Sequence, residues 1–373
     1  MNSQSGLLHM IAVFTFGAAL TSLPPAPPVP ALPAMPKVTS FPDQPKLASL
    51  PELPSIPSLP PVASLADSSA LSFPYGDDGH FDRTLTVTGP VDLDVQTGAG
   101  NIVVKTGDAS KVEVHATIRA NHRSGDVTKY IQEIEANPPI DQNGNVIRVG
   151  RIENNDWKRN ISISYELVVP AQTKLRTESG SGDEKIDGVA GPLDSSSGSG
   201  SLTISNIGNE VRAQSGSGSV NLKNVHGGAK LTAGSGSISA SGIAGGLIAS
   251  SGSGSIHLEQ TAPGNAEIHT GSGEIEVTGA NGGVVAQTGS GGVSVEGTPA
   301  GEWRLRSGSG DLNVKLPPQA SFNLVAHTGS GSIDSSREIA VQGKISPRDL
   351  QGKVGGGGPV VELSTSSGSI QIR

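Results

Sequence analysis

Four side chains have the types and spacing that come closest to supporting chemistry: His257, Glu274, Glu276 and Asp311. If the segments around them form stacked strands, His257 and Glu276 lie in one outward row on neighbouring strands, about 4.8 Å apart. Glu274 then lies beside Glu276, and Asp311 follows two strands later, so that two carboxylates are about 10 Å apart. That separation is close to the one that inverting glycosidases use.

Three interpretations of this cluster stay open: a catalytic acid and base pair, a ligand-binding patch, and a merely solubilising surface. No aromatic side chain stands nearby in the sequence to hold a sugar ring. Acidic residues on a solvated strand face usually serve solubility alone. We therefore expect no enzymatic activity, and we treat the four residues as a candidate surface site for a partner.

Metal chemistry is not expected from the remaining candidates, and we predict no cofactor. His269 and His327 share another outward row, but three repeats separate them, about 14 Å at the spacing of strands. A calcium-binding β-roll needs a carboxylate at every turn. The corresponding positions here are mostly serine or glycine, with carboxylates only at the first, sixth and eighth: Asp183, Ser201, Ser219, Ser237, Ser255, Glu274, Gly292, Asp311 and Ser332.

These residues belong to a repeat of about eighteen residues that governs the C-terminal half of the chain. Each copy has a Gly-x-Gly turn, and the first glycines are Gly180, Gly198, Gly216, Gly234, Gly252, Gly271, Gly289, Gly308 and Gly329. Without the strand-to-helix context of a phosphate-binding loop, these glycines indicate turns. An earlier copy begins at Thr97, and a last one follows Ser366.

Two short strands flank each turn, because apolar residues stand four and six positions after the first glycine and five and three positions before it. Val220 and Leu222, with Val211 and Ala213, show the pattern around Gly216. One such pair of strands cannot bury its apolar face alone, but stacked copies form a thin continuous core. The sequence therefore predicts an all-β parallel solenoid, with two strands in each repeat of about eighteen residues.

The turn residues suggest how the chain reverses. We expect glycine there because a sharp reversal needs backbone angles that other residues resist. Just before the glycine stands a row of hydroxyl residues that Ala233 alone interrupts: Ser179, Ser197, Ser215, Ser251, Thr270, Thr288, Ser307 and Thr328. The row is either an exposed ice-binding or sugar-binding face or a means of satisfying the turns, and the second is favoured.

Two segments interrupt the repeat. After a strand-like region at residues 81–118, residues 124–136 have the spacing of a short amphipathic helix, with Val127, Tyr130, Ile131 and Ile134 on one face. A hairpin is expected around Asn143 and Gly144, and a strand from Ile161. This insertion should cap or widen the N-terminal end, and residues 336–365 should replace about one repeat near the C-terminal end.

The N-terminal region has a different composition. Residues 7–23 carry no charge and indicate a signal peptide or a membrane anchor, with a buried core helix as a third interpretation. Residues 24–79 form a proline-rich linker, either extended as polyproline II or disordered. We expect the protein to be exported, to the periplasm or outer surface, and to contact a membrane only through this N-terminal segment.

Charge and cysteine content exclude several classes of protein. The net charge is −8, and the 26 basic residues are scattered, so nucleic acid is not an expected partner. The chain has no cysteine, which excludes disulfides, zinc-thiolate sites and a lipidated cysteine.

The recurring (S/T)-G-S-G-(S/D/E)-(I/L/V)-x-(I/V) units, the segment VVPAQTKLRTESGSG and the closing KVGGGGPVVELSTSSGSIQIR carry a family resemblance. Over about residues 80–373 the chain resembles the bacterial putative adhesin domains of β-solenoid type, a family of unknown function. The resemblance implies a stacked β fold and a location in the cell envelope, but no activity. Glu184 departs from the pattern, because it occupies an apolar position.

The leading hypothesis is a non-enzymatic, exported or envelope-anchored surface or scaffold protein. Its partner would be a protein or glycan of the envelope or the extracellular space. One alternative is an enzyme acting on polysaccharides through Glu274, Glu276 and Asp311. Another is a regulatory or scaffolding module that acts on other envelope proteins.

Overall fold

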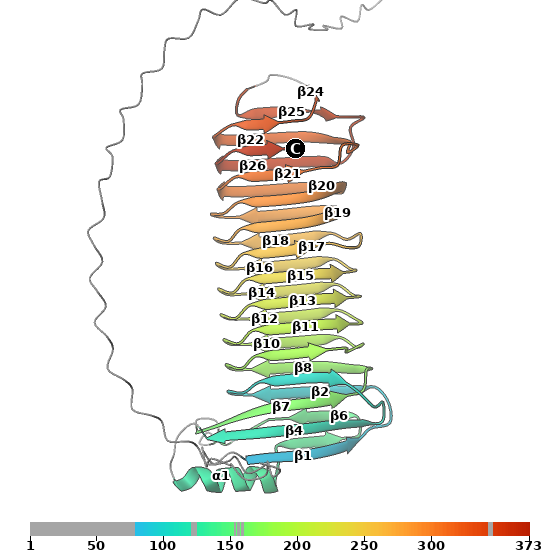
Figure 1. Cartoon of the computed structure of the whole chain (residues 1–373), viewed down its shortest axis with the longest axis vertical. Coiled ribbons are helices and arrows are strands. Elements are labelled where there is room, and N and C mark those ends of the chain that lie inside the picture. Colours follow the sequence, from blue (N-terminus) through green and yellow to red (C-terminus); the bar gives the residue numbers. More distant parts are fainter. Residues whose placement is uncertain (1–78, 121–124, 153, 155–156, 158–159, 342–345) are drawn as a thin grey trace, which may run out of the picture. The chain divides into compact units, whose positions relative to one another are not determined.

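The computed structural model of the chain describes residues 79–120, 125–152, 154, 157, 160–341 and 346–373. The predicted export segment and nearly all of the proline-rich linker lie outside these residues, so both stay predictions. In the described part, the fold is all-β with one helix, and 27 strands belong to one continuous sheet (Figure 1). None of the helical structure there has both the length and the apolarity that crossing a membrane requires.

Two ladders of strands make up most of this sheet. The strands of the first ladder lead into the Gly-x-Gly turns. They are β2 (Val91–Thr97), β8 (Thr173–Ser179), β10 (Leu193–Ser197), β12 (Val211–Ser215), β14 (Ala229–Ala233), β16 (Leu247–Ser251), β18 (Ala266–Thr270), β22 (Phe322–Ser330) and β26 (Val360–Ser367).

The strands of the second ladder leave the turns. They are β3 (Ile102–Thr106), β7 (Ile161–Val169), β9 (Glu184–Asp187), β11 (Leu202–Ile207), β13 (Val220–Val225), β15 (Ile238–Ile243), β17 (Ile256–Glu259), β21 (Leu312–Lys315), β23 (Ile333–Ser335) and β27 (Ile370–Ile372). Two longer strands, β19 (Ile275–Thr288) and β20 (Val293–Ser309), take part in both ladders.

Parallel pairing joins each strand to the corresponding strand of the next repeat. Val211 lies opposite Leu193 on one side and Ala229 on the other, and each step is eighteen residues. Inward positions therefore stack on inward positions throughout the regular part. Trp303, Leu231 and Ala249 are all 0% exposed, as the repeat predicts. Ile333 is only partly buried, because its strand β23 lies at the edge and pairs with β27.

The N-terminal insertion caps its end of the stack. Strand β7 pairs with β3 in parallel and with β4 (Lys111–Ala120) antiparallel, and β1 (Gly79–Thr86) then pairs with β4. The expected hairpin is present as β5 (Ile140–Asn143) and β6 (Val146–Val149). The expected helix is α1 (Gly125–Ala136), whose Glu135 accepts a hydrogen bond from the backbone of His80 on β1. The cap thus covers an edge strand that could otherwise pair with another chain.

The last repeat does not lie at the end of the stack. Strand β26 pairs with β20 on one side and β22 on the other, and β27 lies likewise between β21 and β23. The segment between β23 and β26 forms β24 (Ile339–Val341) and β25 (Asp349–Val354). Strand β25 pairs antiparallel with β22, and β24 pairs antiparallel with β25, so the two strands extend the first ladder beyond β22. As a result, His269 and His327 lie four strands apart, about 19 Å, rather than the three repeats that the sequence suggests.

Our explanation of the turn glycines from backbone angles is wrong. None of the nine first glycines of the turns has a φ in the left-handed region. Instead, a Cβ on Gly216 would overlap the carbonyl oxygen of Gly198 in the preceding repeat, and the other turns repeat this contact. Left-handed residues lie at the opposite turn, where Asn206 and Asn224 have φ of 56° and 54°. The turns stack so closely that only a hydrogen atom fits between them.

The hydroxyl row before these glycines is buried and satisfies the turns. Ser215 Oγ donates to the carbonyl of Gly200 in the preceding repeat at 3.0 Å and accepts the N–H of Gly218 at 2.9 Å. The other hydroxyl residues of the row donate to a glycine carbonyl in the same way. Because these side chains are at most 7% exposed, the row is not an ice-binding or sugar-binding face.

Glu184, the departure from the apolar pattern, lies inside the core and is 1% exposed. Its Oε2 accepts hydrogen bonds from Ser195 Oγ at 2.6 Å and from the hydroxyl of Thr177, while no described residue pairs with Oε1. Burial raises the pKa of this carboxyl, and the two hydroxyl groups offset only part of the effect.

We expect Gly216→Ala to lower the free energy of unfolding by about 1–3 kcal/mol, because its Cβ must displace the Gly198 carbonyl. Gly98→Ala is the matched control at the same turn position, where a Cβ meets no heavy atom within 4 Å. Chemical denaturation of both variants measures the difference. Equal stability of the two would contradict the close-contact explanation.

The interrupted hydroxyl row allows a paired test. Ala233→Ser should add about 1 kcal/mol to the free energy of unfolding, because the new hydroxyl can donate to the stacked glycine carbonyl as its neighbours do. Ser215→Ala should remove about the same amount or more, since it leaves Gly218 N–H without its acceptor. Thermal unfolding measures both changes, and a loss of stability in Ala233→Ser would refute the proposed role of the row.

Glu184 should make stability depend on pH. Its pKa in the folded protein is raised above the unfolded value of about 4.3, so wild-type stability falls as pH rises through the folded pKa. We expect Glu184→Gln to remove this fall, so that the stability of the variant relative to the wild type increases as pH rises. Denaturation at several pH values tests this. The exposed Glu259→Gln is the control, and parallel curves for wild type and Glu184→Gln would be the contrary result.

Candidate functional site

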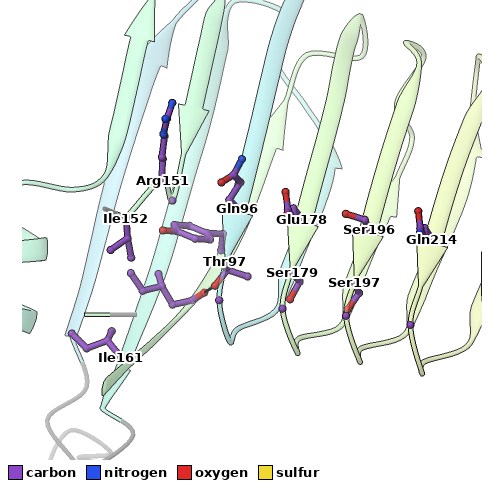
Figure 2. Close-up of a pocket in the computed structure, with 17 residues that line it drawn as sticks. Gln96, Thr97, Arg151, Ile152, Ile161, Glu178, Ser179, Ser196, Ser197 and Gln214 are labelled. Carbon is purple, nitrogen blue, oxygen red and sulfur yellow. Dashed lines mark hydrogen bonds between the residues drawn. The ribbon is translucent and has the colours of Figure 1, made fainter. Parts of the chain in front are cut away.

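A cavity of about 850 Å³ opens beside the first ladder near the N-terminal end of the stack (Figure 2). One wall is an outward row two residues before the turn glycines: Gln96 on β2, Glu178 on β8, Ser196 on β10 and Gln214 on β12. The strand register places them on successive strands. Figure 2 shows the four side chains projecting on one side of these strands. The spacing of paired strands sets neighbouring members of the row about 4.8 Å apart.

A second wall comes from the insertion and includes Arg151, Ile152, Ile161, Ile163 and Tyr165. Hydrogen bonds tie this wall to the first repeat. Thr97 Oγ1 donates to the carbonyl of Ile163 at 2.7 Å, and the Ser162 hydroxyl donates to the carbonyl of Ala99.

Gly150 allows the two walls to meet. It has a φ of +83°, and a Cβ there would overlap the Gln96 carbonyl oxygen. Glycine is therefore required at this position both by its backbone angle and by the space available.

Tyr165 contributes a buried hydroxyl to the cavity lining. The residue is 1% exposed, and its ring packs edge-on against Phe81 with 6.4 Å between ring centres. No described residue hydrogen-bonds to this hydroxyl, whereas buried hydroxyl groups are normally paired. Burial raises the pKa of Tyr165, so the group stays protonated and able to donate a hydrogen bond.

The lining is suited to recognition by hydrogen bonds. The amides of Gln96 and Gln214 both donate and accept, Ser196 adds a hydroxyl, and Arg151 adds donors from the second wall. Among the described residues of the lining, Glu178 is the only carboxylate. Glycoside hydrolysis ordinarily uses two carboxyl groups.

The cluster predicted from the sequence lies on the second ladder. His257 Nδ1 and Glu276 Oε2 are 3.0 Å apart, so the expected pairing is confirmed. Both side chains are about half exposed, at 49% and 52%. An ion pair this exposed contributes little stability.

Glu274 and Asp311 flank Gly292 in the neighbouring row, also exposed. Asp311 Oδ1 accepts a hydrogen bond from the backbone of Ser369 at 2.7 Å, so its carboxylate supports the next turn. The surrounding strands form an open face rather than an enclosed site. A role for these four residues in contacting a partner stays a prediction. Among the described residues, no three acidic or histidine side chains are grouped to hold a metal ion.

Sequence reasoning did not find the cavity. The row that contains Gln96 and Gln214 could be recognised from the repeat, since the two residues stand two positions before a turn glycine. The second wall could not, because only the fold places Arg151 and Tyr165 in the same cavity lining as that row.

Solved structures provide weak matches. A putative cell adhesion protein from Clostridium sporogenes ATCC 15579 is 13% identical, with a TM-score of 0.21, over 79% of this chain and 98% of that one. A putative adhesin from Parabacteroides distasonis ATCC 8503 is 15% identical, with a TM-score of 0.43, over 65% and 98% of the two chains. A putative lipid binding protein from the same organism is 9% identical, with a TM-score of 0.26, over 80% and 98%. None of the curated proteins matches the sequence.

A family model covers almost the whole described part of the chain. The match runs over residues 81–373, from the third residue of β1 to the last residue of the chain, and includes the cavity. The chain therefore belongs to the Toastrack DUF4097 family.

Proposed function

We propose that this protein is an exported or envelope-anchored β-solenoid that acts without catalysis, as an adhesin-like surface or scaffold protein. Support for the solenoid comes from parallel pairing at a step of eighteen residues between inward positions. Support for export comes from the uncharged segment at residues 7–23 and the proline-rich linker after it.

The cavity beside the first ladder is the proposed contact site, and the observation that carries this proposal is its polar row. Gln96, Glu178, Ser196 and Gln214 present hydrogen-bonding groups at every strand, about 4.8 Å apart, and Tyr165 lines the same cavity. A partner with polar groups repeated along its length can satisfy such a row.

A glycan of the cell envelope fits this chemistry better than an extended peptide. Peptides that bind sheets usually add a strand to an open edge and use backbone hydrogen bonds. The cavity instead offers side chains on the face of a ladder whose strands pair on both sides. Amide and carboxylate groups match the hydroxyl groups of a sugar chain as donors and acceptors.

We expect Gln96→Ala and Gln214→Ala to weaken binding of cell-wall glycan fragments about five- to tenfold each, the loss of about one hydrogen bond. Asn221→Ala, an amide on the outward face of the second ladder, should bind like wild type. Calorimetric titration measures the affinities. Absence of binding by the wild type, or equal loss in all three variants, would contradict the proposed site.

Fractionation of cells tests the proposed location separately. The full-length protein should be found in the envelope or outside the cell, and mass spectrometry of its mature N-terminus should show whether residues 1–23 are removed. Recovery of the full-length protein free in the cytoplasm would refute export.

A further inference from the structure

One outward row of the first ladder has a charge pattern that complements itself. The row has one residue per strand, from Arg176 on β8 to Glu362 on β26, and Ile248 on β16 is its central member. Ile248 is 42% exposed, one of the few large apolar side chains exposed in the described part. Beside it lies a groove of about 700 Å³ with backbone glycines on its floor.

Charges of opposite sign stand at equal distances from Ile248. Lys230 lies one strand before it and Glu267 one strand after it. Asp194 lies three strands before Ile248, and Arg304 lies three strands after it. Arg176 lies four strands before Ile248, and Glu362 lies four strands after it. At the second positions, Arg212 is matched by Val285. No position pairs two charges of the same sign.

We infer that this face joins two copies of the chain in a twofold symmetric dimer. The axis lies parallel to the strands, between the two copies at Ile248, so that the stacks run in opposite directions. Ile248 then meets Ile248 of the partner subunit. Lys230 faces the partner's Glu267, Asp194 faces the partner's Arg304, and each contact occurs twice, as a C2 interface requires.

The neighbouring outward row agrees with this arrangement. Ser250 is its central member, with Thr232 and His269 on either side and Gln214 and Gln287 beyond them. Under the same axis these residues face one another without a pair of like charges. The small central side chains also let the two sheets approach to the spacing of about 10 Å that packed sheets have.

Several charges of the row have no partner within the subunit. Among the described residues, Lys230, Arg212, Asp194 and Arg176 take part in no ion pair, although each is exposed. Their counterparts across the axis already have partners within the subunit: Glu267 contacts His269, and Arg304 and Glu362 contact each other. Like charges would also penalise a parallel arrangement of two copies, in which Lys230 would face the partner's Lys230. The antiparallel dimer pairs these charges and avoids that repulsion.

The available area sets the expected strength. Nine strands at about 4.8 Å and a width of five residues give about 700 Å² per copy. The total of about 1,400 Å² is in the lower part of the range of specific interfaces. The dimer should therefore form reversibly at micromolar concentration and weaken as salt is added.

Sedimentation velocity of the full chain tests this inference. Lys230→Glu and Glu267→Lys each place like charges across the axis, and each should raise the dissociation constant of the dimer about tenfold or more. An equimolar mixture of the two variants should dimerise again, because every facing pair is then opposite in sign. The double variant Lys230→Glu with Glu267→Lys should recover the homodimer as well. Lys223→Glu, on the second ladder, should dimerise like wild type.

A crosslinking experiment tests the position of the axis. The chain has no cysteine, so Ile248→Cys introduces one thiol, which a short bifunctional maleimide should link to its mate, because facing sheets about 10 Å apart hold the two Cα atoms too far apart for a direct disulfide. Thr203→Cys, exposed on the second ladder, should crosslink slowly. A wild type that is monomeric at all concentrations, failure of the mixed variants to associate, or equal crosslinking of both thiols would overturn the inference. Gln214 belongs both to the glycan site and to this face, so bound glycan should weaken the dimer. Gln96 on β2 lies outside the nine strands, so Gln96→Ala should weaken glycan binding and leave the dimer unchanged, which keeps the two proposals distinguishable.

Discussion

The contact between successive glycine turns is the constraint on which the rest of this structure depends. Parallel pairing holds neighbouring repeats at the spacing of β-strands, and at that spacing no Cβ fits between Gly216 and the carbonyl of Gly198. The same closeness lets a buried hydroxyl such as Ser215 reach the glycine carbonyl of the repeat before it. Because every repeat meets the next in this way, the inward apolar positions align without further adjustment. Glycine is thus needed here for space and not for unusual backbone angles.

The stack of repeats has two ends. At each end, the strands pair in an order that differs from their order in the sequence. At the N-terminal end, β7 passes beside β3, and β4, β1 and α1 follow outward. At the other end, β26 and β27 enter between strands that precede them in sequence, and β25 turns the edge antiparallel. The cavity is a consequence of the first closure, because the returning insertion places Tyr165 and Arg151 beside the polar row of the first ladder.

The outward faces differ in what they offer. On the second ladder, the pair His257 and Glu276 is open to solvent, and Asp311 supports a turn. On the first ladder, one end has a cavity lined on one side by polar side chains, and the centre has charges arranged symmetrically about Ile248. A repeating backbone therefore carries distinct surfaces, because the outward positions are free of the constraints that fix the turns and the core.

The sequence by itself determined the repeat, its inward positions, the helix at α1 and the hairpin at Gly144, because each depends on local periodicity or turn chemistry. It also placed His257 next to Glu276, since a constant period fixes which outward residues are neighbours. Only the tertiary structure decided where the final repeat lies, and so how far His269 is from His327. It alone brought Tyr165 and Gln96 into the lining of one cavity. These contacts involve segments that do not follow the eighteen-residue period. Their neighbours are therefore decided by packing in three dimensions and cannot be predicted from the spacing of residues.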